Sequence, residues 1–298
     1  MSVSMILLTL LWIIGAVYIV AWAIQIRRQG KLVWPPLLDI AIGLLIGFVT
    51  DFFDTLGIGS FAPTTAFFKL FKFLPDEKIP GTLNVGHGLP TIVEALLFIA
   101  VVQVDPVTLV SMIAASVAGA WLGAGFVARL PRRGVQIGMG IALIVAALLF
   151  LKSALDVHVA SGSALGLSGW TLAFAIVANF ALGALMTLGI GLYAPALILV
   201  SLLGMNPLTA WPIMMGSCAF LMPIASLRFI RLNAYSLKAA LCLTVGGIPA
   251  VYIAFKFVHN LSLTAIRWLV IVVVLYAAFT MLRSAYLERT RKTFTTAT

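Results

Sequence analysis

The chain has 298 residues, of which 62% are hydrophobic and 9% are charged. A soluble domain carries about a quarter charged residues, so this composition excludes an ordinary soluble protein and predicts an all-α polytopic membrane protein. The net charge of +10 comes from short basic clusters between apolar runs. Such clusters are typical of cytoplasmic loops, and no interleaved aromatic and basic pattern indicates a nucleic-acid partner.

The first predicted element is an apolar helix over residues 5–26. No basic segment precedes it, no small-residue cleavage site follows it, and Arg27 and Arg28 come directly after its end. A signal peptide that is removed has a basic segment first and a cleavage site last. We therefore expect residues 1–30 to form a retained transmembrane helix whose N-terminus lies outside the cell.

The apolar runs that follow are of two kinds. Simple spans of about 20 residues, the length that crosses a bilayer, are predicted at 81–103, 107–128, 134–151, 209–227, 236–257 and 264–283. Two longer stretches, 37–74 and 168–205, are about twice that length, so one straight helix accounts for neither of them.

Both long stretches contain nearly the same phrase. TLGIGSFAP occupies residues 55–63 and TLGIGLYAP occupies residues 187–195, with seven of nine positions identical. Pro80 and Pro212 have the same separation of 132 residues. We interpret the chain as two copies of one unit, each a broken, folded-back helix pair plus three spans. The predicted divisions are the extra N-terminal helix, a first copy at 37–152, a linker at 153–165, a second copy at 166–285 and a tail at 286–298.

The basic clusters orient the two copies in the membrane. If each long stretch returns to the side from which it entered, the clusters around 27–31, 129–133, 228–238 and 283–292 all lie in the cytoplasm, as the positive-inside rule requires. The two copies are then inverted relative to each other, an arrangement that recurs in secondary transporters. We expect a multi-pass protein of a bacterial inner membrane with a cytoplasmic C-terminus.

The Gly-rich phrase predicts a helix break inside the membrane. Glycine permits positive φ and proline is tolerated in the first turn of a helix, so one helix is expected to end near Leu56 and another to begin near Ser60. The first amides of the new helix lack partners and carry the positive end of the helix dipole, an environment that favours an anion. The alternative is a structural kink where small residues let helices pack, but two inverted copies favour a shared anion site.

The predicted substrate site comprises both phrases and the polar groups near them. Backbone amides are expected to hold the anion, and the side chains of Ser60, Thr64, Asn84 and Tyr193 are candidates for further hydrogen bonds. The predicted binding residues are Gly57, Ile58, Gly59, Ser60, Phe61, Pro63, Thr64, Asn84 and His87 in the first copy, and Gly189, Ile190, Gly191, Tyr193 and Pro195 in the second.

The acidic residues of the first copy have two alternative roles. Asp51 and Asp54 are three residues apart and share a helix face, and Glu94 lies in the next span. Ionised carboxylates are expensive inside a membrane, and beside an anion site they repel the substrate unless they are protonated. They are therefore candidates for proton coupling, as is His87. In the alternative they pair internally and hold the packing of the first copy.

The residues from Gly47 to Pro63 resemble a known family. The order Gly47-Phe48-Val49-Thr50-Asp51, then Gly57-Ile58-Gly59, then Pro63, is similar to the phrases that open both halves of the duplicated TauE/SafE sulfite exporters. The sequence departs from that pattern at Ile58 and Ser60, where glycines are common, and its second copy has no Asp. The resemblance implies transport of sulfite, sulfoacetate or another organosulfonate, whereas spacing alone implies only a small anion.

These observations together favour a secondary transporter for a small sulfur-containing oxyanion, with proton coupling as one option. The alternative is a proton- or cation-coupled carrier of another small organic anion, such as a carboxylate. A membrane enzyme is not expected, because the chain has no HExxH or GxSxG motif. No cofactor or metal site is expected. The expected partners are the small anion and the lipid bilayer, and the sequence does not indicate an oligomeric state.

Overall fold

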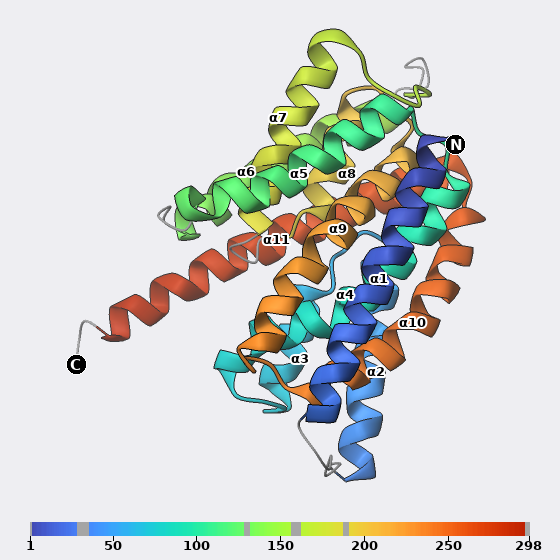
Figure 1. Ribbon diagram of the computed structural model, residues 1–298. Coiled ribbons are helices and arrows are strands. Elements are labelled where there is room, and N and C mark those ends of the chain that lie inside the picture. The colour runs from blue at the N-terminus through green and yellow to red at the C-terminus, as the bar shows by residue number, and fades with distance from the viewer. Residues whose placement is uncertain (1, 29–35, 128–131, 156–161, 187–190, 296–298) are drawn as a thin grey trace. The chain divides into compact units, whose positions relative to one another are not determined.

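The computed structural model describes residues 2–28, 36–127, 132–155, 162–186 and 191–295, and these ranges are almost entirely helical (Figure 1). The elements in chain order are α1 (Val3–Arg28), α2 (Leu37–Thr55), α3 (Phe61–Leu70), the 3-10 helix η1 (Asp76–Lys78), α4 (Ile79–Val101), α5 (Pro106–Val127), α6 (Arg132–Leu155), α7 (Gly169–Met186), α8 (Tyr193–Leu202), the 3-10 helix η2 (Pro207–Thr209), α9 (Ala210–Arg231), α10 (Leu237–His259) and α11 (Leu263–Thr295). The all-α fold predicted from composition is confirmed.

The helices have the lengths that a membrane protein requires. Six of the described segments are long and apolar enough to cross a bilayer: Val3–Arg28, Ile79–Val101, Gly169–Met186, Pro207–Arg231, Leu237–His259 and Thr264–Leu287. By contrast, α3 and α8 have 10 residues each and extend about 15 Å, half the thickness of a hydrocarbon core. The prediction of a multi-pass membrane protein is confirmed.

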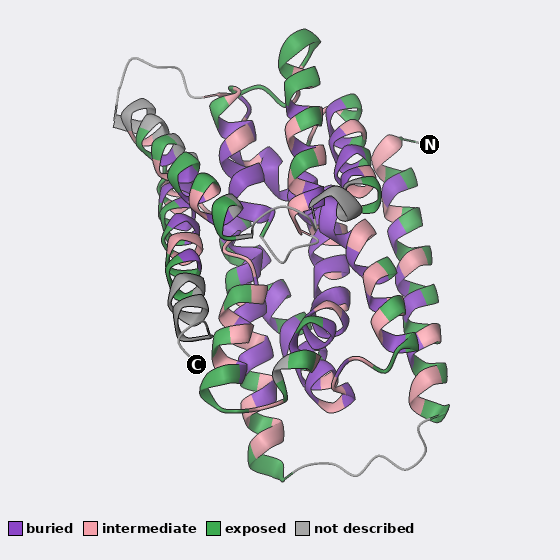
Figure 2. Ribbon diagram, turned by 90° about the vertical axis from the view of Figure 1, so that its left-hand side faces the viewer, coloured by how far each residue is buried: buried purple, intermediate pink, exposed green. Residues whose placement is uncertain are grey.

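Exposed residues, green in Figure 2, lie along several helices, and many of them are large apolar residues. Trp12 of α1, Trp121 of α5 and Trp170 of α7 are 68%, 83% and 84% exposed. A soluble monomer rarely exposes large apolar patches, whereas lipid tails are as apolar as these side chains. The distribution therefore fits helices that face a bilayer.

The chain forms two compact units, and each contains helices from both halves of the sequence. The first unit comprises Met1–Pro106 and Met215–Asn260, and the second comprises Val107–Met214 and Leu261–Thr298. These units do not follow the two sequence copies expected at 37–152 and 166–285. The division of the sequence into copies stays a prediction.

In the first unit, α2 and α4 run in the same direction. Asp51 Oδ1 of α2 lies 2.8 Å from His87 Nδ1 of α4, and further along both helices the Thr55 hydroxyl oxygen lies 2.7 Å from Glu94 Oε1. Between them in the chain, α3 contacts both helices. Because the contacts advance together along α2 and α4, the chain must turn back through α3 before α4 begins. This geometry supports the folded-back path predicted for 37–74.

Two glycines allow α10 to pack directly against the backbone of α2. A Cβ atom added at Gly47 would lie 2.6 Å from the Leu243 carbonyl oxygen, and one added at Gly246 would collide with the Leu44 carbonyl. Each glycine therefore faces the residue three positions before the other glycine. Small residues at such positions let helices approach closely in membranes, so a helix from the second half of the sequence becomes part of the first unit.

The second unit has the same kind of crossing between α5 and α7. A Cβ atom added at Gly183 would collide with the Ser116 carbonyl, and one added at Gly119 would collide with the Phe180 carbonyl. Again each glycine faces the residue three positions before the other. In both units, the first long helix of one half packs against the fourth helix of the other half. This correspondence supports the duplication predicted from the repeated phrase.

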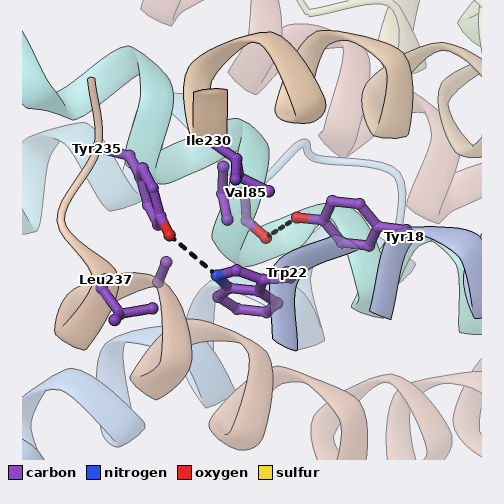
Figure 3. Packing of buried hydrophobic residues seen from close by; sticks show 7 residues of the cluster. Tyr18, Trp22, Val85, Ile230, Tyr235 and Leu237 are labelled. Atoms are coloured by element: carbon purple, nitrogen blue, oxygen red, sulfur yellow. Dashed lines mark hydrogen bonds between the residues drawn. The ribbon is translucent and has the colours of Figure 1, made fainter. Parts of the chain in front are cut away.

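The extra helix α1 is attached to the first unit by two aromatic residues (Figure 3). The Tyr18 hydroxyl donates to the Val85 carbonyl at 2.8 Å, and Trp22 Nε1 donates to the Tyr235 hydroxyl at 3.1 Å. The Tyr18 and Trp22 rings stack with 6.0 Å between their centroids, and Ile230 completes the buried cluster around them. Hydrogen bonds and packing therefore join α1 to α4 and to the α9–α10 connection.

The glycine crossing between α2 and α10 predicts a specific stability effect. We expect Gly246→Ala to lower the free energy of unfolding by about 1–3 kcal/mol, because the new methyl group meets a backbone carbonyl that cannot rotate away. Thermal unfolding in detergent measures the loss. Gly138→Ala in α6 is the matched control, since nothing lies within 4 Å of a Cβ atom there and alanine is favoured over glycine in a helix. Equal losses in both variants would contradict the close crossing.

Candidate functional site

The predicted helix break is present in the first unit. The last residue of α2 is Thr55, and α3 begins at Phe61. Gly57 has φ of 96° and Gly59 has φ of 90°, values that glycine adopts readily and other residues rarely adopt. The break predicted at Gly57 to Gly59 is confirmed, and its cause is the backbone freedom of these two glycines.

A carboxylate of the protein itself occupies the start of α3. Asp54 Oδ1 accepts a hydrogen bond from the Ser60 amide at 2.7 Å, and Oδ2 accepts one from the Ser60 hydroxyl at 3.1 Å. Both residues are 3% exposed. A negative charge is stabilised at a helix N-terminus. Asp54 therefore takes the kind of position that sequence reasoning assigned to the substrate anion.

Asp51, His87 and Thr64 form a continuous chain of hydrogen bonds beside this position. His87 Nδ1 lies 2.8 Å from Asp51 Oδ1, and His87 Nε2 lies 3.0 Å from the Thr64 hydroxyl oxygen. All three residues are 0% exposed. The Thr64 hydroxyl also donates to the Ser60 carbonyl at 2.8 Å. The chain therefore ends at the same residue that Asp54 binds.

These hydrogen bonds are all satisfied when a single proton lies between Asp51 and His87. A threonine hydroxyl has one proton, and when that of Thr64 is directed at the Ser60 carbonyl, His87 Nε2 is the donor to Thr64. Nδ1 then either accepts from a protonated Asp51 or donates to an ionised Asp51. In both forms the pair is electrically neutral overall, which lowers the free-energy penalty of burying it among apolar helices.

Glu94 belongs to the same buried region. The Thr55 hydroxyl lies 2.7 Å from Glu94 Oε1 and 2.8 Å from the Asp51 carbonyl, and both Thr55 and Glu94 are 0% exposed. The structure thus brings together Asp51, Asp54 and Glu94, the three acidic residues singled out in the sequence. Across the described ranges, no three His, Cys, Asp or Glu side chains are grouped so as to hold a metal ion.

A glycine of α10, which sequence reasoning missed, forms the wall behind Asp51. A Cβ atom added at Gly247 would collide with Asp51 Oδ2 and would lie 2.9 Å from Cγ of Pro90. Asp51 Oδ2 is buried and has no hydrogen-bond partner among the described residues. The feature of the sequence that could have indicated this contact is the pair Gly246-Gly247 in an apolar span, but a glycine pair does not show which helix it will contact.

The other predicted residues of the first copy lie at different distances from this network. The Phe61 ring and the His87 imidazole are 6.1 Å apart between centroids, and Ile58 and Pro63 are partly exposed near the break. The side-chain amide of Asn84 donates to a carbonyl of its own helix at 2.9 Å. Its role as a binding residue stays a prediction.

The second phrase is described in part and belongs to the second unit. Gly189 and Ile190 lie outside the described residues. Gly191 is exposed, whereas Tyr193 and Pro195 are buried in the first turn of α8. The expectation that the two phrases share one substrate site stays a prediction.

The start of α8 differs chemically from the start of α3. Its N-cap residue is Leu192, which has an apolar side chain, whereas the N-cap residue of α3 is Ser60. The residues 132 positions after Asp51 and Asp54 are Gly183 and Met186. The titratable network at the first break therefore has no counterpart at these positions of the second copy.

A comparison with protein families gives a match over the region that contains this network. The sequence model of the family described as Sulfite exporter TauE/SafE matches residues 2–150, half of the chain. No curated protein and no solved structure matches the chain. The matched residues include Asp51, Asp54 and His87.

The Asp51–His87 pair predicts non-additive effects on stability. We expect Asp51→Ala and His87→Ala each to lower the free energy of unfolding by about 3 kcal/mol, because each leaves a buried polar partner unsatisfied. The double variant should lose less than the sum by about 1–3 kcal/mol. Unfolding in one lipid–detergent mixture measures all three variants. Asp39→Ala, at the other end of α2, should combine additively with His87→Ala. Additive losses for Asp51→Ala and His87→Ala would show that the two side chains do not interact.

Proposed function

The chain belongs to the TauE/SafE family of membrane transporters, and from this premise we propose that it is a secondary transporter of a small sulfur-containing oxyanion across the bacterial inner membrane. Sulfite is the first candidate, because the matching family is described as sulfite exporters, and sulfoacetate or another organosulfonate is the next. The observation that carries the proposal is the buried network at the α2–α3 break, where titratable groups and helix-start donors meet within apolar helices.

We further propose that transport involves proton exchange at Asp54, which takes up a proton when the substrate anion binds. The Ser60 amide and hydroxyl donate to Asp54, and an oxyanion needs the same donors. Protonation of Asp54 removes the charge that these donors stabilise, so a sulfite or sulfonate oxygen can accept from them in its place. One proton enters as one anion binds, so for a singly charged anion the net charge of the buried site stays constant, and the repulsion between substrate and carboxylate is removed.

The Asp51–His87 pair is the proposed partner of Asp54 in this exchange. The pair shares one proton and is linked through Thr64 to Ser60. Asp51 and Asp54 also share one face of α2. A change in the charge of Asp54 therefore acts directly on a neighbouring group that can gain or release a proton.

The second phrase has a complementary role in this proposal. The N-cap residue of α8 is Leu192, whose side chain has no polar atom, whereas the N-cap residue of α3 is Ser60. We propose that Gly189, Ile190, Gly191 and the first turn of α8 at Tyr193 and Pro195 bind the substrate without proton exchange. The absence of an acidic residue at the position equivalent to Asp54 supports this division of roles.

Flux measurements on purified protein in liposomes test the proposal. We expect labelled sulfite or sulfoacetate to move faster than in empty liposomes, and a pH gradient to accelerate the movement. Asp54→Asn should keep anion flux but lose the acceleration, because an amide does not change charge with pH. The loss should be about tenfold, which corresponds to about 1.4 kcal/mol of proton-linked driving force. Asp39→Asn, at the exposed start of the same helix, is the control and should respond to the gradient like the unchanged protein.

Two outcomes would overturn parts of this proposal. Flux no greater than in empty liposomes for every sulfur oxyanion would refute the transport function. Equal competition by simple carboxylates and by sulfoacetate would instead indicate a carrier of small organic anions in general.

A further inference from the structure

Pro90 interrupts the backbone hydrogen bonds of α4 close to His87. Proline has no N–H, so the carbonyl four residues earlier, that of Gly86, has no donor from its own helix. The Thr244 hydroxyl of α10 donates to this carbonyl at 2.6 Å. The two helices are close at this level, since a Cβ atom added at Gly86 would lie 2.7 Å from Cδ1 of Leu243. A side chain from the second half of the sequence therefore replaces the missing donor.

The two preceding carbonyls of α4 also accept hydroxyl groups from other helices. Ser226 of α9 donates to the Asn84 carbonyl and Tyr18 of α1 donates to the Val85 carbonyl, both at 2.8 Å; Figure 3 shows the second of these bonds. Hydroxyls from three other helices therefore bond to three successive carbonyls of α4 and hold it in place.

We propose that Tyr18, Ser226 and Thr244 are positioning residues for His87. Their hydroxyls hold the three carbonyls directly before His87, and Pro90 removes the helix's own donor to the last of these, the carbonyl of Gly86. The extra helix α1 and the helix α10 thereby determine where His87 lies, although neither supplies a ligand to its imidazole among the described residues.

The position of His87 matters because its partners are fixed at short distances. Its bonds to Asp51 and Thr64 are 2.8 Å and 3.0 Å long, and such bonds are lost when a site loosens by about 1 Å. The consequence for transport rests on the proposed function, because it requires the Asp51–His87 pair to take part in proton exchange. The positioning itself does not require it.

The three hydroxyls are suited to a test because their removal leaves the charges around His87 unchanged. The titratable groups at or next to the His87 network include Asp51 and Asp54 of α2, Glu94 of α4 and Tyr18 of α1. In addition, α3 presents the Thr64 hydroxyl and α10 presents the Thr244 hydroxyl. Thr244→Val and Tyr18→Phe each remove one hydrogen bond and add no charge. A change in the NMR signals of the His87 imidazole in these variants therefore indicates that the ring has moved.

The decisive measurement is the ¹⁵N NMR spectrum of the His87 imidazole. A background with His158→Asn and His259→Asn leaves His87 as the single histidine. We expect Thr244→Val and Tyr18→Phe to shift the Nδ1 and Nε2 signals toward those of a ring that lacks one of its two partners. In liposomes, the same variants should lose about fivefold of the proton-driven flux, the factor associated with one buried hydrogen bond.

Two conservative variants serve as controls. Thr280→Val removes a hydroxyl that bonds within α11 at 2.9 Å, and Tyr252→Phe removes one from a tyrosine that is 50% exposed on α10. Both should leave the His87 signals unchanged. Identical His87 spectra in Thr244→Val, Tyr18→Phe and these controls would overturn the inference, even if the variants differ in melting temperature. Because the NMR readout needs no substrate, it decides the question whether or not the unchanged protein transports sulfur oxyanions.

Discussion

The first unit depends on the buried hydrogen bond between Asp51 and His87 inside an apolar helix bundle. An isolated charge in that environment carries a large free-energy penalty, so the surrounding elements are arranged to make the pair neutral and hydrogen-bonded. The glycine break turns the chain so that Thr64 of α3 reaches Nε2 of His87. On the opposite side, Gly247 of α10 leaves room for the second carboxylate oxygen of Asp51. The glycine break, the returning helix α3 and the glycine of α10 therefore all help to keep the buried Asp51–His87 pair neutral and hydrogen-bonded.

The exchange of helices between the halves of the sequence follows from close backbone packing. In a membrane, helices gain little from hydrophobic burial against one another, and contact between small residues contributes much of their association. Reciprocal glycines join α2 to α10 in one unit and α5 to α7 in the other. Each half of the sequence therefore completes the unit that begins in the other half, and the site at the first break includes residues from both.

The two copies of the Gly-rich phrase have diverged in chemistry. At the first, Asp54 already occupies the donors of Ser60, and a histidine and further carboxylates lie close by. At the second, the N-cap residue of α8 is the apolar Leu192. Under the proposed function, the two helix starts divide the tasks of binding an anion and responding to protons, because a titratable carboxylate is required at only one of them.

The sequence by itself determined the features that depend on composition and local backbone chemistry. Apolar runs predict the helices, and Gly57, Gly59 and Pro63 predict where α2 ends and α3 begins, because proline and glycine limit the backbone wherever they occur. Only the tertiary structure decided which polar groups meet. Asp51 finds His87 36 residues away, and Thr244 finds the Gly86 carbonyl 158 residues away. Helices that are apolar on nearly every side do not specify which faces will touch, so backbone packing in three dimensions selects these partners.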